Sequence, residues 1–264
     1  MKMKQEKGYL VYNPSPHAKL KLLCFHHAGG SALSMVPLVR DLSEDVEVCL
    51  FELPGRGMTN DLPFLSTFCE AKEYLFKTVF HYIDRPAVLF GHSLGGLFVY
   101  ALSSLLDEKS QYIKKLIISA ARSPITVANH ATHPEAPFTR RTRESIIADI
   151  RRLGGVPNEL ESDSKLFNSI VDVTGRDFHL LDTFKFDDKA LVNYPMELWL
   201  GTQDSAVPDG EVKLWEKMAL NDYKCKYFNG GHFYLSEGEE PAKELRQELM
   251  NIYTNIKGGV IHAN

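Results

Sequence analysis

Residues 88–96 read Val-Leu-Phe-Gly-His-Ser-Leu-Gly-Gly, and this stretch indicates the fold. An apolar run that ends at Phe90 precedes a Gly-x-Ser-x-Gly turn at residues 91–95, and a helix-forming run at 97–106 follows it. A strand that turns sharply into a helix holds the serine hydroxyl of the turn exposed at the edge of a sheet. The N-terminus of that helix would face any negative charge that develops beside Ser93. We therefore predict that Ser93 is a nucleophile.

Short apolar runs alternate with helical patterns along most of the chain. The expected strands are near-continuously apolar, as is typical of parallel strands that are covered on both faces. They are 20–25, 46–51, 87–90, 116–119, 196–200 and 224–228. The expected helices are 35–42, 68–83, 97–106, 210–219 and 241–256. The alternation predicts an α/β fold with a doubly wound, mostly parallel sheet, and the serine turn makes it an α/β-hydrolase fold.

The stretch 122–193 breaks this rhythm, because it contains no convincing strand. Helical patterns cover 139–153, 163–174 and 177–184, and the sequence Gly-Gly-Val-Pro at 154–157 separates the first two. An insertion at this point of the chain would lie above the carboxyl ends of the sheet, where the serine is expected. We interpret it as a helical lid within a single domain of residues 1–264. An ordinary pair of crossover helices is the alternative.

The composition is that of an ordinary globular protein, with 264 residues, 44% hydrophobic, 24% charged and a formal net charge of −4. This charge is too small to indicate a nucleic-acid partner, and no apolar run is long enough to indicate a membrane partner. The first residues are polar and do not resemble a signal peptide. The four cysteines are scattered and typical of a reduced protein, so we expect a cytoplasmic location. No apolar stripe stands out, so we expect a monomer.

A serine hydroxyl needs a neutral imidazole to accept its proton and a carboxylate to orient that imidazole. Among the ten histidines, His232 is the best candidate, because it follows the last expected strand in a glycine-rich loop. Asp204 directly follows the preceding expected strand, so it would face the same crevice. Asp209 is the alternative acid, but its surroundings are typical of a turn or a helix start. We therefore predict a catalytic triad of Ser93, Asp204 and His232.

Negative charge that develops on a substrate carbonyl oxygen needs two fixed N–H donors. The backbone of Leu94, next after the serine, would supply one. The loop Phe-His-His-Ala-Gly-Gly-Ser at 25–31 would supply the other, and we choose Ala28, with His27 as the alternative. His92 precedes the serine and should point away from it, so we assign it a packing role. The two adjacent histidines of the loop lack a third ligand at a metal-site spacing, so we expect no metal.

Nearly the whole chain resembles the type II thioesterases that accompany non-ribosomal peptide and polyketide synthases. The resemblance rests on the serine turn, the acid and base segments, the first-strand loop, a Leu-Pro-Gly-Arg-Gly segment and the Gly-Gly-Val-Pro break. The first-strand loop departs from the family at His26, where proline is usual, and this departure bears on the rigidity of the Ala28 backbone. The matching segments are 24–32, 53–57, 91–96, 154–157, 201–204 and 230–233.

The resemblance implies hydrolysis of acyl thioesters on the phosphopantetheine arm of an acyl or peptidyl carrier protein, usually to edit stalled or wrong acyl groups. It implies no metal or redox cofactor, since the substrate itself carries the phosphopantetheine. A thiolate leaves readily, so Ser93 would be acylated easily, and His232 would then activate water. Three alternatives remain: a medium-chain fatty-acyl thioesterase, a general carboxylesterase, and a non-catalytic carrier-binding scaffold.

The expected lid carries residues that could meet the carrier and the acyl group. Carrier proteins are typically acidic, so a cluster of arginines in the lid is a candidate docking surface, with a solvated amphipathic helix as the alternative. The candidate docking residues are Arg140, Arg141 and Arg143. The candidate residues that line the acyl pocket are Phe138, Phe167 and Phe178.

Overall fold

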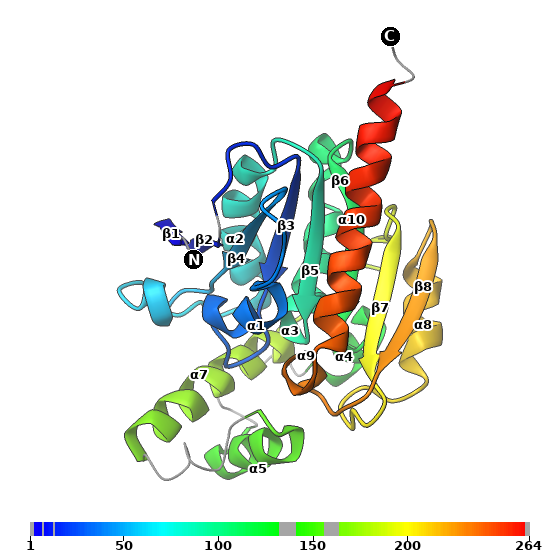
Figure 1. The fold of residues 1–264 in the computed structure, drawn as a ribbon. Helices are drawn as coiled ribbons and strands as arrows, with labels where there is room; N and C mark the ends of the chain where they lie inside the picture. Colours follow the sequence, from blue (N-terminus) through cyan, green and yellow to red (C-terminus); the bar gives the residue numbers. More distant parts are fainter. Residues whose placement is uncertain (1–2, 7, 13, 132–140, 156–163, 262–264) are drawn as a thin grey trace.

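The computed structural model describes residues 3–6, 8–12, 14–131, 141–155 and 164–261. Eight strands form one sheet in the order β1-β2-β4-β3-β5-β6-β7-β8 (Figure 1). Strands β3 to β8 run parallel to one another, whereas β1 and β2 are antiparallel additions at the β4 edge. The mostly parallel α/β fold is therefore confirmed. The six parallel strands are β3 (Leu20–Phe25), β4 (Val46–Phe51), β5 (Ala87–His92), β6 (Ile113–Ser119), β7 (Met196–Gly201) and β8 (Tyr223–Phe228).

The sequence analysis missed the first two strands, β1 (Met3–Glu6) and β2 (Tyr9–Tyr12). Each has only four residues, and β1 is polar and largely exposed, so neither gives a clear periodic signal. Strand β2 pairs with β4 through Leu10 and Leu50, and its side chains are mostly buried. Strand β1 then pairs with β2 in an antiparallel orientation and forms the edge of the sheet.

Helices cover both faces of the sheet, and each parallel strand sends alternate side chains to the two faces. On one face, Leu23 packs in the same core cluster as the buried residues of α2 (Phe68–Tyr82) and α3 (Leu94–Ser103). On the other face, Leu22 packs with the buried side chains of α10 (Glu240–Ile261). The remaining flanking helices are α1 (Val36–Val39), α8 (Glu211–Met218) and α9 (Tyr234–Glu237), with short 3-10 turns at Ala32–Met35, Gly57–Thr59 and Asp107–Lys109. No helix in the described ranges is both long and apolar enough to cross a membrane.

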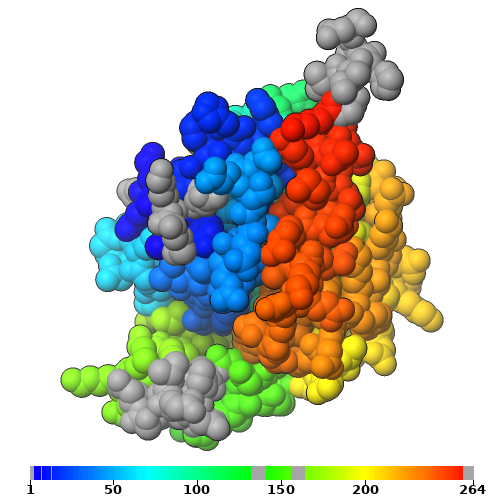
Figure 2. All heavy atoms as spheres, viewed as in Figure 1, coloured from blue at the N-terminus to red at the C-terminus, as the bar shows by residue number. Residues whose placement is uncertain are grey.

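Between β6 and β7 the chain forms helices α4 (Pro124–His130), α5 (Arg143–Leu153) and α7 (Ser164–Asp182). We call residues 122–193 the insertion. Figure 1 shows α5 and α7 beyond the carboxyl ends of the parallel strands, and Figure 2 shows this green segment as a lobe below the body. The expectation of two helices at 163–174 and 177–184 is wrong, because α7 is one helix that continues through Gly175. Gly175 is buried there, and packing outweighs the cost of about 1 kcal/mol that glycine imposes on a helix.

Helices α5 and α7 have a small hydrophobic cluster of their own, separate from the two clusters that flank the sheet. Its buried members are Ile146, Ile150, Phe167 and Val171. Gly154 ends α5 in the left-handed conformation, with φ of 74°, as expected for the glycine break at this point.

Candidate active site

Ser93 occupies the sharp turn between β5 and α3, with φ of 55° and ψ of −114°. A positive φ is strained for a residue with a side chain, and such strain is found mostly at functional sites. The turn is fixed because the Ser93 N–H donates to the carbonyl oxygen of Ser119 at 2.7 Å. The hydroxyl therefore stands at the carboxyl edge of the sheet, at the N-terminus of α3.

Two glycines make this turn sterically possible. A Cβ atom on Gly91 would lie 2.1 Å from the carbonyl oxygen of Gly95. A Cβ atom on Gly95 would lie 2.1 Å from the carbonyl oxygen of Phe25 and 2.8 Å from that of His26. The loop after β3 thus lies directly against the first turn of α3, so both expected oxyanion donors, Leu94 and Ala28, belong to segments that touch.

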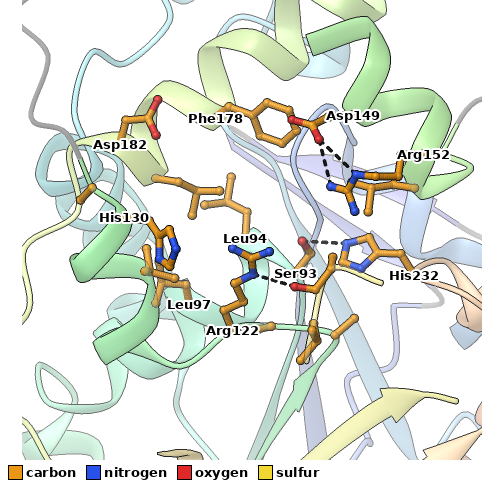
Figure 3. A pocket seen from close by; sticks show the side chains of 18 of the residues that line it. Ser93, Leu94, Leu97, Arg122, His130, Asp149, Arg152, Phe178, Asp182 and His232 are labelled. Atoms are coloured by element: carbon orange, nitrogen blue, oxygen red, sulfur yellow. Dashed lines mark hydrogen bonds and ion pairs between the residues drawn. The ribbon is translucent and has the colours of Figure 1, made fainter. Parts of the chain in front are cut away.

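The structure brings together the three side chains that the sequence singled out. His232 follows β8, and its Nε2 lies 3.0 Å from the Oγ of Ser93 (Figure 3). Its Nδ1 lies 2.8 Å from the Oδ2 of Asp204, which follows β7. The other oxygen of Asp204 accepts from the Ala206 N–H at 2.8 Å. His232 and Asp204 are only 6% and 9% exposed, so little water competes for these contacts.

His92 lies behind His232, with 5.4 Å between the ring centroids. Its Nδ1 is 2.8 Å from the Oγ of Ser119, which in turn is 2.6 Å from the hydroxyl of Tyr234. Burial, with the nearby His232 and His27 rings, holds the pKa of His92 well below its usual range. A neutral, buried ring in this place agrees with the packing role that we expected for it.

The loop after β3 is held by its own side chains. The Nδ1 of His26 donates to the carbonyl oxygen of His27 at 2.7 Å, and its Nε2 accepts from the Leu53 N–H at 3.4 Å. Burial and the nearby Arg56 lower the pKa of His26 to about 3, so the ring stays neutral and keeps both roles. His27 donates in the same way to the carbonyl oxygen of Ala28, at 2.9 Å. His26 is thus bonded to the backbone at both of its ring nitrogens.

A buried ion pair joins this loop to the insertion, and the sequence analysis did not identify it. Asp177 of α7 accepts from both terminal nitrogens of Arg56, at 2.5 and 2.6 Å, and from the Gly29 N–H at 2.7 Å. Arg56 also donates to the carbonyl oxygen of Gly30 at 3.2 Å. The Leu-Pro-Gly-Arg-Gly segment was the available signal for Arg56, but nothing local pointed to its partner in α7.

A pocket with a volume of about 320 Å³ opens beside Ser93 and His232. It lies between the carboxyl edge of the sheet and the insertion, which contributes residues from α4, α5 and α7 (Figure 3). This is within the size range of small-molecule sites. Its lining includes Ser93, Leu94, Leu97, Arg122, Val127, His130, Arg141, Asp149, Arg152, Phe178, Asp182 and His232.

The residues proposed from sequence for the lid differ in their surroundings. Arg141 and Phe178 line the pocket, and Arg141 makes a bidentate ion pair with Asp182 at 2.9 Å. Phe167 is not among the lining residues, because it packs in the cluster between α5 and α7. Arg143 is exposed and bonds to Asp172 at 2.7 Å. Phe138 and Arg140 lie outside the described residues.

No group of His, Cys, Asp or Glu side chains in the described ranges is arranged to hold a metal ion.

Comparison with known proteins assigns this arrangement to a family. The family model described as "Thioesterase domain" matches residues 20–249. The chain is 24% identical to a probable cadicidin biosynthesis thioesterase of Streptomyces griseus over 90% of its own length, but spans only 64% of that protein. It is also 24% identical to the gramicidin S biosynthesis protein GrsT of Aneurinibacillus migulanus, over 92% of this chain and 95% of that one.

Solved structures show the same fold. The type II thioesterase BorB from the borrelidin biosynthetic cluster superposes with a TM-score of 0.76 at 24% sequence identity. The match covers 96% of this chain and 98% of that one, so the sheet and its flanking helices share one architecture over nearly their full lengths.

Proposed function

The chain belongs to the thioesterase family, and we propose that it is an editing thioesterase of a natural-product synthase, acting on acyl groups carried by phosphopantetheine on carrier proteins. The contact of His232 with both Ser93 and Asp204 carries this proposal, because it is the arrangement that acyl transfer requires. The relatives support the substrate class, since their names refer to the biosynthesis of cadicidin, of gramicidin S and of borrelidin. Removal of stalled acyl groups is the role we infer for this chain.

In the proposed mechanism, the Oγ of Ser93 attacks the thioester carbonyl carbon while the Nε2 of His232 accepts the hydroxyl proton. Asp204 holds Nδ1–H and stabilises the imidazolium that forms. The C–S bond then breaks, and His232 returns the proton to the leaving sulfur. A water molecule attacks the acyl-enzyme with His232 again as base, which releases the acid and restores Ser93.

The proposed oxyanion hole consists of the backbone N–H groups of Leu94 and Ala28. Leu94 begins α3, so its N–H lies at the positive end of the helix dipole. Ala28 lies in the loop that touches the start of α3 and that His26 and Asp177 hold in place. Donors that are fixed before the reaction stabilise the developing charge without reorganisation.

We also propose that the insertion acts as a lid on this site. Helices α5 and α7 border the pocket with Arg152 and Phe178, and they pack against each other through their own hydrophobic cluster.

We further propose that the carrier protein docks on the arginines of the lid. Among those that the structure describes, Arg143 is exposed. Reversal of the Arg143 charge should slow turnover of carrier-bound substrate at low salt and leave acyl-pantetheine turnover unchanged. If wild type and the Arg143 variant hydrolysed the carrier-bound substrate at equal rates, docking at this residue would be contradicted.

The central experiment compares hydrolysis of acyl-carrier thioesters, acyl-CoA and a simple oxygen ester, each with a short and a medium acyl chain, by wild type, Ser93→Ala and Asp204→Asn. We expect the carrier thioester to be preferred, and Ser93→Ala to lower kcat by about 10⁶. A fluorophosphonate should label Ser93 in the wild type and not in the alanine variant. Preference for the oxygen ester would favour a carboxylesterase, and preference for medium chains a fatty-acyl thioesterase. An unlabelled Ser93 would favour a scaffold.

A further inference from the structure

Three buried polar side chains are hydrogen-bonded to one another directly behind the proposed triad. They come from separate elements, since His92 ends β5, Ser119 ends β6 and Tyr234 begins α9. The Oγ of Ser119 lies 2.8 Å from the Nδ1 of His92 and 2.6 Å from the hydroxyl of Tyr234. We call these three residues the buried network. Each is at most 1% exposed, so water does not replace a contact that is lost.

The direction of the hydrogen bonds in the buried network follows from its two ends. Among the described residues, Ser119 is the one hydrogen-bond partner of the Tyr234 hydroxyl. That hydroxyl therefore donates to Ser119, because a buried donor without an acceptor is costly. Ser119 then donates its own proton to the Nδ1 of His92. A neutral imidazole has one donor and one acceptor nitrogen, so the proton of His92 lies on Nε2.

The Nε2–H of His92 faces the backbone of His232. Within the described part of the chain, this nitrogen is buried and has no hydrogen bond of ordinary geometry. Burial lowers the pKa of His92 most strongly, whereas the backbone of His232 raises it. A backbone group that raises the pKa of a histidine is a carbonyl oxygen that accepts from the ring. The ring centroids of His92 and His232 are 5.4 Å apart, so the two side chains are neighbours.

The buried network also holds the nucleophile. The carbonyl oxygen of Ser119 accepts from the Ser93 N–H at 2.7 Å, and His92 is the residue before Ser93. Tyr234, at the other end of the network, is the second residue after His232. Ser119 is therefore bonded through its backbone to the turn of the nucleophile, and through its side chain to the loop of the base.

We propose that the buried network positions the base, because it fixes the backbone of His232 so that Nε2 stays within hydrogen-bond distance of Ser93. This role goes beyond packing, and it rests on the proposed hydrolysis at Ser93. The pocket lining that the structure describes includes none of the three residues, so they act through His232 and not on the substrate. A displacement of about 1 Å in a reacting group can cost about a hundredfold in rate, so the effect should fall on kcat.

The first test is Ser119→Ala, which removes only a hydroxyl, with butyryl-pantetheine as a substrate that needs no carrier docking. We expect kcat to fall about tenfold or more and KM to change less than twofold. A fluorophosphonate should label Ser93 more slowly by a similar factor, because labelling uses the same base. Ser103→Ala is the matched control, since Ser103 is buried and donates to the carbonyl oxygen of Tyr100 at 2.7 Å. It should lower the thermal midpoint to a similar extent and leave kcat unchanged.

Two substitutions at His92 separate positioning from packing. His92→Gln keeps an amide N–H donor near the place of Nε2, whereas His92→Leu keeps similar bulk without a donor. We expect kcat to stay within about threefold of wild type in the glutamine variant and to fall about tenfold or more in the leucine variant. In the His92→Leu background, Ser119→Ala should cost less than a further twofold, because both residues act through one series of hydrogen bonds.

Tyr234→Phe gives a second route to the same answer if Ser119→Ala does not fold. It removes one oxygen atom from the end of the buried network, and it keeps the ring that stacks on Phe228 at 5.3 Å between centroids. We expect it to lower kcat about threefold or more without a matching change in KM.

The outcomes separate this inference from the proposed function. A kcat of Ser119→Ala within twofold of wild type would overturn the positioning role and leave the hydrolase intact. Equal kcat values for His92→Gln and His92→Leu would overturn it too, as would a full further loss from Ser119→Ala in the His92→Leu background. A wild type that neither hydrolyses butyryl-pantetheine nor reacts with the fluorophosphonate would contradict the proposed function itself.

Discussion

Arg56 and Asp177 form a two-bond ion pair between residues 121 positions apart, and their side chains are only 6% and 1% exposed. Arg56 lies in the loop after β4, and Asp177 lies on α7 of the insertion. The same carboxylate accepts from the Gly29 N–H, one residue after the proposed oxyanion donor Ala28. The pair therefore ties the insertion to the loop on which the proposed chemistry depends.

Removing one partner of this pair should weaken both the fold and the reaction. We expect Asp177→Asn to lower the free energy of unfolding by about 3–5 kcal/mol, because the Arg56 charge stays buried without its partner. It should also lower kcat, because the acceptor for Gly29 becomes weaker. Urea titration and single-substrate kinetics measure the two effects.

The double variant Arg56→Met/Asp177→Leu separates the two effects. Apolar side chains of similar size should recover most of the stability. They should not recover kcat, since the Gly29 N–H then has no side-chain acceptor. Full recovery of kcat in the double variant would show that the pair is structural only.

Gly95 should tolerate no side chain. The added Cβ of Gly95→Ala would overlap the backbone carbonyl oxygen of Phe25, which cannot move without distorting β3. We expect a loss of about 1–3 kcal/mol in stability and a drop of more than a hundredfold in kcat. Gly238→Ala is the matched control, because Gly238 is exposed, has extended backbone and has open space around its Cβ position. Similar thermal melts and rates for the two variants would refute the close approach.

Stability should fall as the pH decreases below about 6.5, where an ordinary histidine titrates. Burial lowers the pKa of His26 to about 3 and that of His92 well below its usual range. The unfolded chain then binds protons that the folded chain does not, so the free energy of unfolding decreases with falling pH. Each histidine contributes up to about 1.4 kcal/mol per pH unit between the two pKa values.

Denaturant titrations at several pH values from 7.5 to 4.5 measure the slope of the free energy of unfolding against pH. His26→Asn should reduce it by about 1.4 kcal/mol per pH unit, whatever its effect at neutral pH. His17→Gln, at an exposed position, should leave the slope unchanged. A slope that is the same in wild type and His26→Asn would mean that His26 is not buried as a neutral ring.

Glu197 should matter for stability and not for turnover. It is 1% exposed in β7 and accepts from Lys115 at 2.8 Å, Lys226 at 2.9 Å and the Trp199 indole at 2.9 Å. Glu197→Gln should lower the free energy of unfolding by about 2–3 kcal/mol, because these charged donors lose a buried anionic acceptor. Glu216→Gln, exposed on α8, should stay within about 0.5 kcal/mol of wild type. A kcat reduced more than twofold in Glu197→Gln would contradict a purely structural role.

The sequence was most informative where the signal was local. The parallel strands were predictable because buried strands read as apolar runs, and the geometry at Ser93 was predictable because Gly91 and Gly95 mark a tight turn. Proximity of Asp204 and His232 followed from a general rule, since both come after parallel strands whose carboxyl ends share an edge.

The features that the sequence analysis did not predict depend on contacts between segments that are distant in the chain. The pairing of Arg56 with Asp177 carries no periodic signature, and neither does the contact of Ser119 with His92 and Tyr234. The short strands β1 and β2 form because β4 offers an edge, and α7 continues through Gly175 because its face is buried. Tertiary packing decides each of these features, so a single sequence does not reveal them.

Strands β6 and β7 are neighbours, with Leu116 opposite Met196, although the whole insertion lies between them in the chain. The polypeptide thus leaves the sheet and re-enters it at adjacent positions, so segments of different length can join the same two strands without altering their register. The proposed catalytic residues Ser93, Asp204 and His232 lie outside that segment, whereas much of the pocket wall lies within it. Selectivity can therefore diversify during evolution by exchange of one contiguous stretch of gene, provided that each replacement keeps a carboxylate where Asp177 stands.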